Sequence, residues 1–483
     1  MSIARTGLLT VFALIAVGLT RLVHGSLVSH ATDRVTYGLV GSLIALSTVA
    51  SLMLPGGLSS AMAKYVALER GAGRPAAARA VHRLLTRWSM ASGPLLGLAA
   101  AGIAAVVWDL SRSEAFAVWL LTTSYSVYSV DKSALYGFGR SGAYAILEVA
   151  TSSLAILATV ATVVFGGTAY LLPLAVGYAV FVLGARLLLR APADEPGATS
   201  QAGPAVRPVL VYAVVASVGT LAGQGFLQGT QLLAGWFARP EEVAWFAASV
   251  ALVAPLYFLP RALGLALFPA MAAAYGAGDH EAVRRQGDVS TRALATLQAP
   301  VFAAAALLAP WLLVVFGGAE YAAGADVLRL MLAATWLGVL QVPSINALAS
   351  DAGRRARIPA AAAVTGCLTG LLVVAVLGGP LGATGVALGY LAGSAVTAAI
   401  PMVLVWRAER MPWAGTLARS CAVLVTASLA ATTVDAAGRS AWAVPLAVVA
   451  ALLAAVVMIP DARALLRVLR PGKPAAAAVQ ESS

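Results

Sequence analysis

The chain has few of the residues on which metal, redox and disulfide chemistry depends. Its 483 residues include only 2 cysteines and 4 histidines. Cys367 and Cys421 lie in separate apolar stretches, where a structural disulfide is not expected. The sequence also lacks a Gly-x-x-x-x-Gly-Lys-Ser/Thr phosphate loop and a clustered set of histidine and glutamate ligands. We therefore expect no metal site, no cofactor and no ATP hydrolysis.

Charged residues are scarce as well. They make up 11% of the chain, whereas hydrophobic residues make up 60% and the mean hydropathy is +0.87. This apolar surface is too large for one soluble core, so the sequence predicts an all-α polytopic membrane protein. Windows of roughly 20 residues predict fourteen transmembrane helices. They lie near residues 8–28, 37–61, 88–108, 116–136, 143–165, 170–189, 209–237, 243–267, 293–316, 325–349, 360–377, 385–405, 417–434 and 442–459.

The basic residues are distributed unevenly between the connections that join these helices. They are concentrated in alternate connections, at residues 64–87, 186–207, 284–292, 354–357, 407–419 and 463–473. The positive-inside rule therefore predicts a multi-pass protein of a bacterial cytoplasmic (inner) membrane with both termini in the cytoplasm. The net charge of +12 then needs no nucleic-acid partner, because the basic loops face anionic membrane lipids.

An internal repeat relates the two halves of the chain. Leu54-Pro55 recurs as Leu259-Pro260 at an offset of 205 residues (259 minus 54), and Gly177-Tyr178 recurs as Gly389-Tyr390 at an offset of 212 (389 minus 177). Two parallel six-helix bundles are therefore predicted, and bundles of this kind favour a transporter. The predicted parts are bundle 1–190, cytoplasmic linker 191–208, bundle 209–406, an extra helix pair 407–460 and a disordered cytoplasmic tail 461–483.

Three short motifs carry a family resemblance. They are Ala63-Lys64-Tyr65-Val66-Ala67 with the loop that follows it, Phe316-Gly317-Gly318-Ala319-Glu320-Tyr321, and Gly382-Ala383-Thr384-Gly385-Val386-Ala387. With these motifs the chain resembles the multidrug, oligosaccharidyl-lipid and polysaccharide (MOP) exporter superfamily, and its polysaccharide-repeat-unit flippase branch above all. The resemblance implies two helix bundles around a cavity that opens alternately to the two membrane faces. It also implies a lipid-linked oligosaccharide as substrate, with a polysaccharide polymerase and glycosyltransferases as partners.

Arg21 and Arg261 are the predicted binding residues for a diphosphate. Multidrug members of the superfamily often carry a carboxylate in the first helix, whereas this first span carries Arg21. A guanidinium can donate two parallel hydrogen bonds to phosphate oxygens. Arg261 follows Pro260, which would kink its helix and expose carbonyls to a polar cavity. The alternative for both residues is a side chain that snorkels to the membrane surface.

Polar side chains mark two further candidate regions. Gln224, Gln228 and Gln231 share a face of the seventh span, where amides would suit sugar hydroxyls or bind a neighbouring helix. A second set could form an ionic gate, or Glu148 could titrate and couple transport to an ion, although a purely structural role is equally open. This second set is Asp131, Lys132, Arg140 and Glu148.

Together these features predict a flippase that moves a polyprenyl-pyrophosphate-linked oligosaccharide from the cytoplasmic to the outer leaflet. A multidrug cation antiporter and a lipid II flippase are the alternatives. A membrane-bound glycosyltransferase is a third class, but the predicted external loops are too short to hold a separate catalytic domain.

Overall fold

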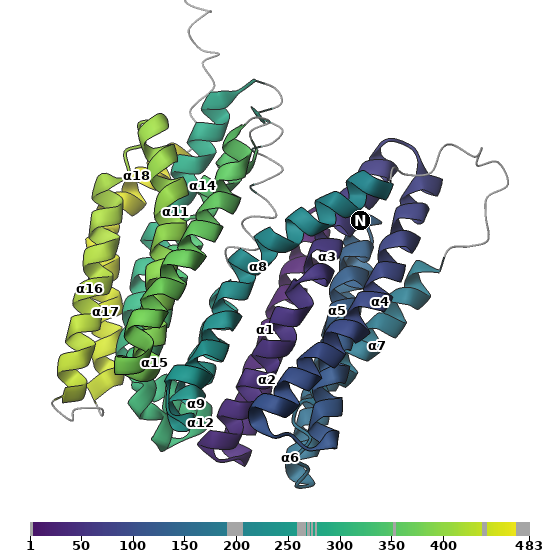
Figure 1. Ribbon diagram of the computed structural model, residues 1–483. Coiled ribbons are helices and arrows are strands. Elements are labelled where there is room, and N and C mark those ends of the chain that lie inside the picture. Colours follow the sequence, from purple (N-terminus) through teal and green to yellow (C-terminus); the bar gives the residue numbers. More distant parts are fainter. Residues whose placement is uncertain are drawn as a thin grey trace, which may run out of the picture. The chain divides into compact units, whose positions relative to one another are not determined.

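The described part of the chain consists of helices joined by short connections. The computed structural model describes residues 3–190, 206–257, 267, 271, 274–275, 278–350, 354–436 and 442–469, and no strand occurs within these ranges (Figure 1). Eight helices there are long and apolar enough to cross a membrane, or up to ten if each of two bent pairs counts as one span. The predicted all-α polytopic fold is confirmed, whereas the count of fourteen spans stays a prediction.

The first predicted bundle contains seven helices. They are α1 (Ile3–Ala31), α2 (Arg34–Leu52), α3 (Leu54–Gly71), α4 (Pro75–Trp108), α5 (Arg112–Gly137), α6 (Ser141–Val164) and α7 (Leu172–Leu189). Local signals fix several of their ends. Asp33 caps α2, Ser111 and Glu114 form a capping box on α5, and Pro55 opens α3 after a break at Met53. The second predicted span is therefore two helices.

The second half adds α8 (Val206–Phe237), α9 (Pro240–Val253), η1 (Ala254–Tyr257), α11 (His280–Leu307), α12 (Ala309–Gly317), η2 (Ala319–Gly324), α13 (Ala325–Leu340), α14 (Val342–Ala349), η3 (Arg354–Arg357) and α15 (Ile358–Ala408). The long α15 is a hairpin that covers two predicted spans. It folds back at Gly382, which has φ 56° and ψ −134°. Its two arms touch through glycines, because a Cβ placed on Gly393 would lie 2.6 Å from the Gly366 carbonyl oxygen.

The C-terminal part contains α16 (Ala414–Ala436), α17 (Ala443–Val457) and α18 (Ile459–Leu469). The axis of α18 is bent by 50° from that of α17. Residues 461–469 belong to this last helix, so the predicted disordered tail begins instead with ordered structure. Asp461 explains the difference, because it is buried and paired with residues of α16.

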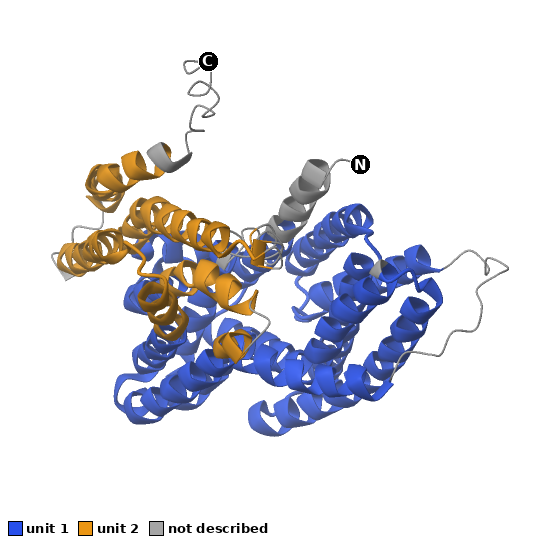
Figure 2. Cartoon of the chain, turned by 90° about the horizontal axis from the view of Figure 1, so that it is seen from above, with its two compact units in different colours: residues 1–262, 309–335, 360–397 blue, residues 263–308, 336–359, 398–483 orange. Residues whose placement is uncertain are grey.

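The contacts divide the chain into two compact units (Figure 2). Unit 1 comprises residues 1–262, 309–335 and 360–397, and unit 2 comprises residues 263–308, 336–359 and 398–483. Unit 1 thus contains the first predicted bundle together with α8, α9, α12 and most of α15. This division does not coincide with the boundary that the repeat predicts at residues 191–208.

Within unit 1, connections predicted to lie on the same side of the membrane do meet. Arg70 donates to the Gly137 carbonyl oxygen at 2.8 Å, and Arg140 donates to the carbonyl oxygen of Leu188. All of these residues lie at connections predicted to be cytoplasmic. The connections predicted to be external meet at the other ends of the same helices, as described below. The orientation of the termini stays a prediction.

Candidate functional site

Arg21 lies against a wall of tyrosines inside unit 1. Its guanidinium carbon lies 5.2 Å from the centroid of the Tyr125 ring on α5, and Tyr178 of α7 lies beside the same group. The Tyr125 and Tyr178 rings are themselves in contact, with centroids 4.9 Å apart. A cation over an aromatic face is stabilised even where water is scarce. Arg21 is half-buried, so this packing holds the charge within the span without covering it completely.

Glu148 lies in the same group of helices and is almost completely buried. Its two carboxylate oxygens accept hydrogen bonds from the Tyr128 hydroxyl at 2.9 and 3.0 Å. The Lys132 ammonium lies 5.1 Å from the centroid of the Tyr128 ring. Tyr128 also touches Tyr178, with centroids 4.8 Å apart. A chain of tyrosines therefore connects the Arg21 guanidinium on α1 with the Glu148 carboxylate on α6. We call its three members, Tyr125, Tyr128 and Tyr178, the tyrosine cluster.

A small cavity adjoins the tyrosine cluster. Its volume is about 20 Å³, and Thr20, Glu148, Thr151 and Tyr178 contribute to its lining. This volume suits one water molecule, which needs two or more polar partners. The hydroxyls and the carboxylate provide such partners, so water or a small cation could reach Glu148 here.

Asp131 belongs to a separate ion pair. Its carboxylate accepts from the Arg186 guanidinium of α7 at 3.1 Å, and its side chain is 1% exposed, against 34% for Arg186. Arg140, as noted, bonds to the backbone of α7. The four residues of the predicted gate therefore do not form one group. Lys132 and Glu148 meet at Tyr128, whereas Asp131 and Arg140 each bind α7 separately. Sequence reasoning missed Arg186, although a buried aspartate in a span signals that a basic partner must exist.

The predicted glutamine face of α8 is divided in the structure. Gln231 is buried and packs against α2, because a Cβ on Gly41 would lie 2.8 Å from its amide nitrogen. Gln228 is half-buried, and Gln224 is exposed. Helix packing therefore uses part of the face, and Gln224 is its exposed member. Arg261, the second predicted diphosphate ligand, lies outside the described residues.

A set of contacts closes unit 1 at the end of α1 and α2 predicted to be external. The hydroxyls of Ser26 and Ser29 donate to the Phe316 carbonyl oxygen at 2.9 and 2.7 Å. The Tyr37 ring meets the rings of Phe316 and Tyr321 edge-on, each with centroids 5.9 Å apart. An ion pair of 3.0 Å also joins Arg34 to Glu320. We call these seven residues the outer closure; they are Ser26, Ser29, Arg34, Tyr37, Phe316, Glu320 and Tyr321.

Two glycines bring α2 against α9 next to the outer closure. A Cβ on Gly38 would lie 3.4 Å from the Val243 Cβ, and one on Gly41 would lie 2.6 Å from the Ala247 Cβ. Small residues permit such close helix packing inside a membrane. The outer closure and this contact both join the predicted first bundle to helices of the predicted second bundle.

Comparison with known proteins identifies the class of fold. The chain is similar to the lipid II flippase MurJ in an inward closed conformation, with 13% identity, 94% of this chain and 98% of that chain covered, and a TM-score of 0.65. It is similar to an inward-facing multidrug resistance MATE family transporter of the MOP superfamily, with 16% identity, coverage of 81% and 94%, and a TM-score of 0.63. It is also similar to a MOP superfamily transporter from Pyrococcus furiosus, with 17% identity, coverage of 84% and 95%, and a TM-score of 0.57.

The sequence comparison agrees over part of the chain. The MatE family profile matches residues 230–376, and no curated protein matches. The chain therefore has the fold of MOP superfamily transporters and flippases. This is the fold that the motif resemblance implied, and the similar proteins are transporters or flippases by name.

Proposed function

We propose that this protein is a flippase that moves a polyprenyl-pyrophosphate-linked oligosaccharide to the outer leaflet of a bacterial inner membrane. The observation that carries the proposal is Arg21. Its half-buried side chain places a guanidinium within α1, where tyrosines stabilise it and no carboxylate of α1 neutralises it. A guanidinium in this setting suits the oxygens of a diphosphate, whereas a cationic drug would be repelled.

Transport would proceed by opening of the outer closure. Its contacts join α1 and α2 to α12 and η2, so substrate release toward the outside requires that they separate. Each of them is weak, since a neutral hydrogen bond contributes roughly 0.5–1.5 kcal/mol and an exposed ion pair about 0–1 kcal/mol. A closure built from several weak contacts can form and break reversibly. In this proposal Gln224 binds sugar hydroxyls.

A multidrug antiporter is the second candidate, and Glu148 is the observation that favours it. A buried carboxylate beside a water-sized cavity can exchange a proton or cation, as an antiporter requires. The same carboxylate is also compatible with an ion-coupled flippase, and a lipid II flippase could be one. Arg21 separates the candidates because it favours an anionic substrate.

The proposed partners follow from the substrate. Glycosyltransferases would build the lipid-linked oligosaccharide on the cytoplasmic leaflet, and a polysaccharide polymerase would use it on the other side. The prenyl tail would stay in the membrane lipids during transfer, because its burial in hydrocarbon is favourable at every stage.

The test is a transport assay with purified protein in liposomes. Three substrates are compared: a fluorescent polyprenyl-pyrophosphate oligosaccharide, lipid II and a cationic dye. We expect flipping of the first, measured as its loss of protection from an impermeant reductant, and no uptake of the dye. Dye uptake with no flipping would support the antiporter. Equal or faster transfer of lipid II would assign the protein to that substrate instead.

A further inference from the structure

The last helix, α18, has an inner and an outer side. Asp461 faces the protein and is 2% exposed, whereas Leu466 is 59% exposed and Ile459 is 37% exposed. At about 100° per residue, Arg463 and Arg467 are neighbours on the side of the helix away from Asp461, and they border the exposed Ile459 and Leu466. A helix with an exposed apolar side bordered by arginines is typical of segments that lie in a membrane surface.

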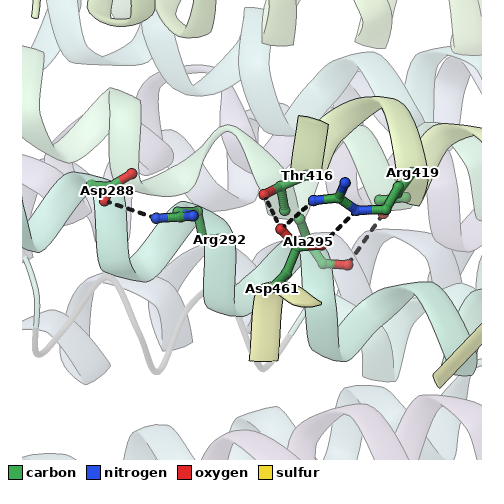
Figure 3. A network of polar contacts seen from close by, with 7 residues as sticks. Asp288, Arg292, Ala295, Thr416, Arg419 and Asp461 are labelled. Atoms are coloured by element: carbon green, nitrogen blue, oxygen red, sulfur yellow. Dashed lines mark hydrogen bonds and ion pairs between the residues drawn. The ribbon is translucent and has the colours of Figure 1, made fainter. Parts of the chain in front are cut away.

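Within unit 2, a polar network around the buried Asp461 fixes α18 against α16 (Figure 3). The Asp461 carboxylate accepts from both Nε and Nη2 of Arg419, at 2.8 and 2.7 Å, and from the Thr416 hydroxyl. Next to this pair on α16, the Ser420 hydroxyl donates to the Ala295 carbonyl oxygen of α11 at 3.2 Å. Two-point binding of a guanidinium specifies orientation as well as strength. The network therefore fixes which sides of α18 face outward.

We propose that α18 is an interfacial anchor that binds anionic phospholipid headgroups of the cytoplasmic leaflet through Arg463 and Arg467. Charge complementarity identifies the ligand. Arg463 is exposed, Arg467 follows one turn later, and Arg470 and Lys473 continue the same charge along the sequence. Anionic headgroups attract basic segments at this depth, while Leu466 and Ile459 would enter the boundary of the acyl chains.

The bend before α18 agrees with this arrangement. A helix that continued straight from α17 would carry Arg463 along the direction of the span, whereas a 50° bend turns α18 toward the membrane plane. The bend coincides with Met458, where α17 ends, and Pro460, which cannot donate a backbone hydrogen bond to the preceding turn. Asp461, directly after the bend, is thus placed against Arg419 of α16.

The test measures lipid contact of α18 in the full-length protein. Cys367 and Cys421 are replaced by serine, Leu466→Cys is labelled with a polarity-sensitive dye, and the protein is placed in vesicles of phosphatidylcholine with or without phosphatidylglycerol. We expect phosphatidylglycerol to shift the emission to shorter wavelength and to increase quenching by lipids that carry a quencher near the headgroup. R463E/R467E should abolish both changes.

Two variants serve as controls. R463K/R467K keeps the charges and should retain the lipid response. R354E/R355E removes the same charge from η3 on the same predicted side of the membrane, and should leave the dye signal unchanged. The proposal is overturned if the dye is equally exposed to water in both vesicle types, or if R354E/R355E removes the response as fully as R463E/R467E does. A loss of flipping is not needed for either outcome, so this test is separate from that of the proposed function.

Discussion

The two repeated halves bury different chemistry in their helices. The first half buries ionisable groups, with Asp131 paired to Arg186 and Glu148 bound to Tyr128. The second half, where it is described, buries the amides of Gln231 and Gln298 and the guanidinium of Arg329, which pairs at 2.9 Å with the exposed Asp326, but it buries no carboxylate. Charges inside a membrane cost far more than amides and persist only where they serve a purpose. The difference that remains is one of buried carboxylates, which teaches that a group able to bind or release a proton or cation inside the helices belongs to the first half.

Replacing Arg21 should have the largest effect on transport. Arg21→Ala removes a charged donor, and a charge-assisted hydrogen bond contributes about 1.5–3 kcal/mol, so flipping should fall at least about tenfold. Arg21→Lys should retain part of the activity because it keeps the charge but loses the planar fork. Gln224→Ala, the matched change in the second half, should cost less. The measurement is the initial flipping rate at equal protein density. Full activity of Arg21→Ala with a larger loss in Gln224→Ala would show that the second half matters more for transport.

Stability should show the same contrast between the halves. Arg186→Ala leaves Asp131 buried without its partner, which should cost roughly 3–5 kcal/mol of unfolding free energy. Gln298→Leu replaces a buried amide by an apolar group of similar size, so it should be nearly neutral or stabilising. Thermal unfolding of the purified variants in detergent measures both. Similar losses of stability would show that the halves do not differ in this way.

Backbone contact between α3 and α8 gives a smaller predicted effect. A Cβ on Gly57 would lie 1.9 Å from the Ala213 carbonyl oxygen, whereas a Cβ on Gly223 of α8 would have no atom within 4 Å. Gly57→Ala should therefore cost about 1–3 kcal/mol through overpacking. Gly223→Ala should be neutral or stabilise the helix by about 0.5–1 kcal/mol. Equal unfolding temperatures for the two variants would mean that the helices separate easily there.

The smallest predicted effect concerns the cap of α2. The hydroxyl and backbone amide of Thr36 donate to the Asp33 carboxylate at 2.6 and 3.0 Å and lower its pKa. Asp33→Ala should cost about 1 kcal/mol at neutral pH. The folded-state pKa is below the ordinary value, so this stabilisation is present above about pH 3.9 and is lost as the pH falls through the lowered value. The wild-type protein and Asp33→Ala should therefore converge in stability under acid, and a constant difference would exclude Asp33 as the cause.

The sequence predicted the fold because its signals are local. Apolar length, basic connections and capping residues such as Asp33 act within a few positions, and they mark where helices begin and end. The helical state of residues 461–469 was missed because it depends on Asp461 meeting Arg419, 42 positions away. A short, basic stretch gives no such contact from the sequence alone.

The candidate site was predicted less completely because it also depends on contacts between residues far apart in the sequence. Arg21 and Glu148 stood out because charge is rare in apolar spans, but the tyrosines that join them come from α5 and α7. The outer closure was not predicted as a contact at all. Its serines and Phe316 are 287 and 290 positions apart, and neither hydroxyls nor a backbone carbonyl mark a site in the sequence.

The most direct test of alternating access is a cross-link between α2 and α9. A disulfide needs Cβ atoms about 3.5–4.5 Å apart, and Gly38 and Val243 meet at 3.4 Å, so G38C/V243C should form one in a background without Cys367 and Cys421. As a control, G93C/S126C joins α4 to α5 within the first half at 3.3 Å. The account predicts that oxidation stops flipping by G38C/V243C, that reduction restores it, and that the cross-linked control stays active. Undiminished flipping by fully cross-linked G38C/V243C would show that the outer closure does not open during transport.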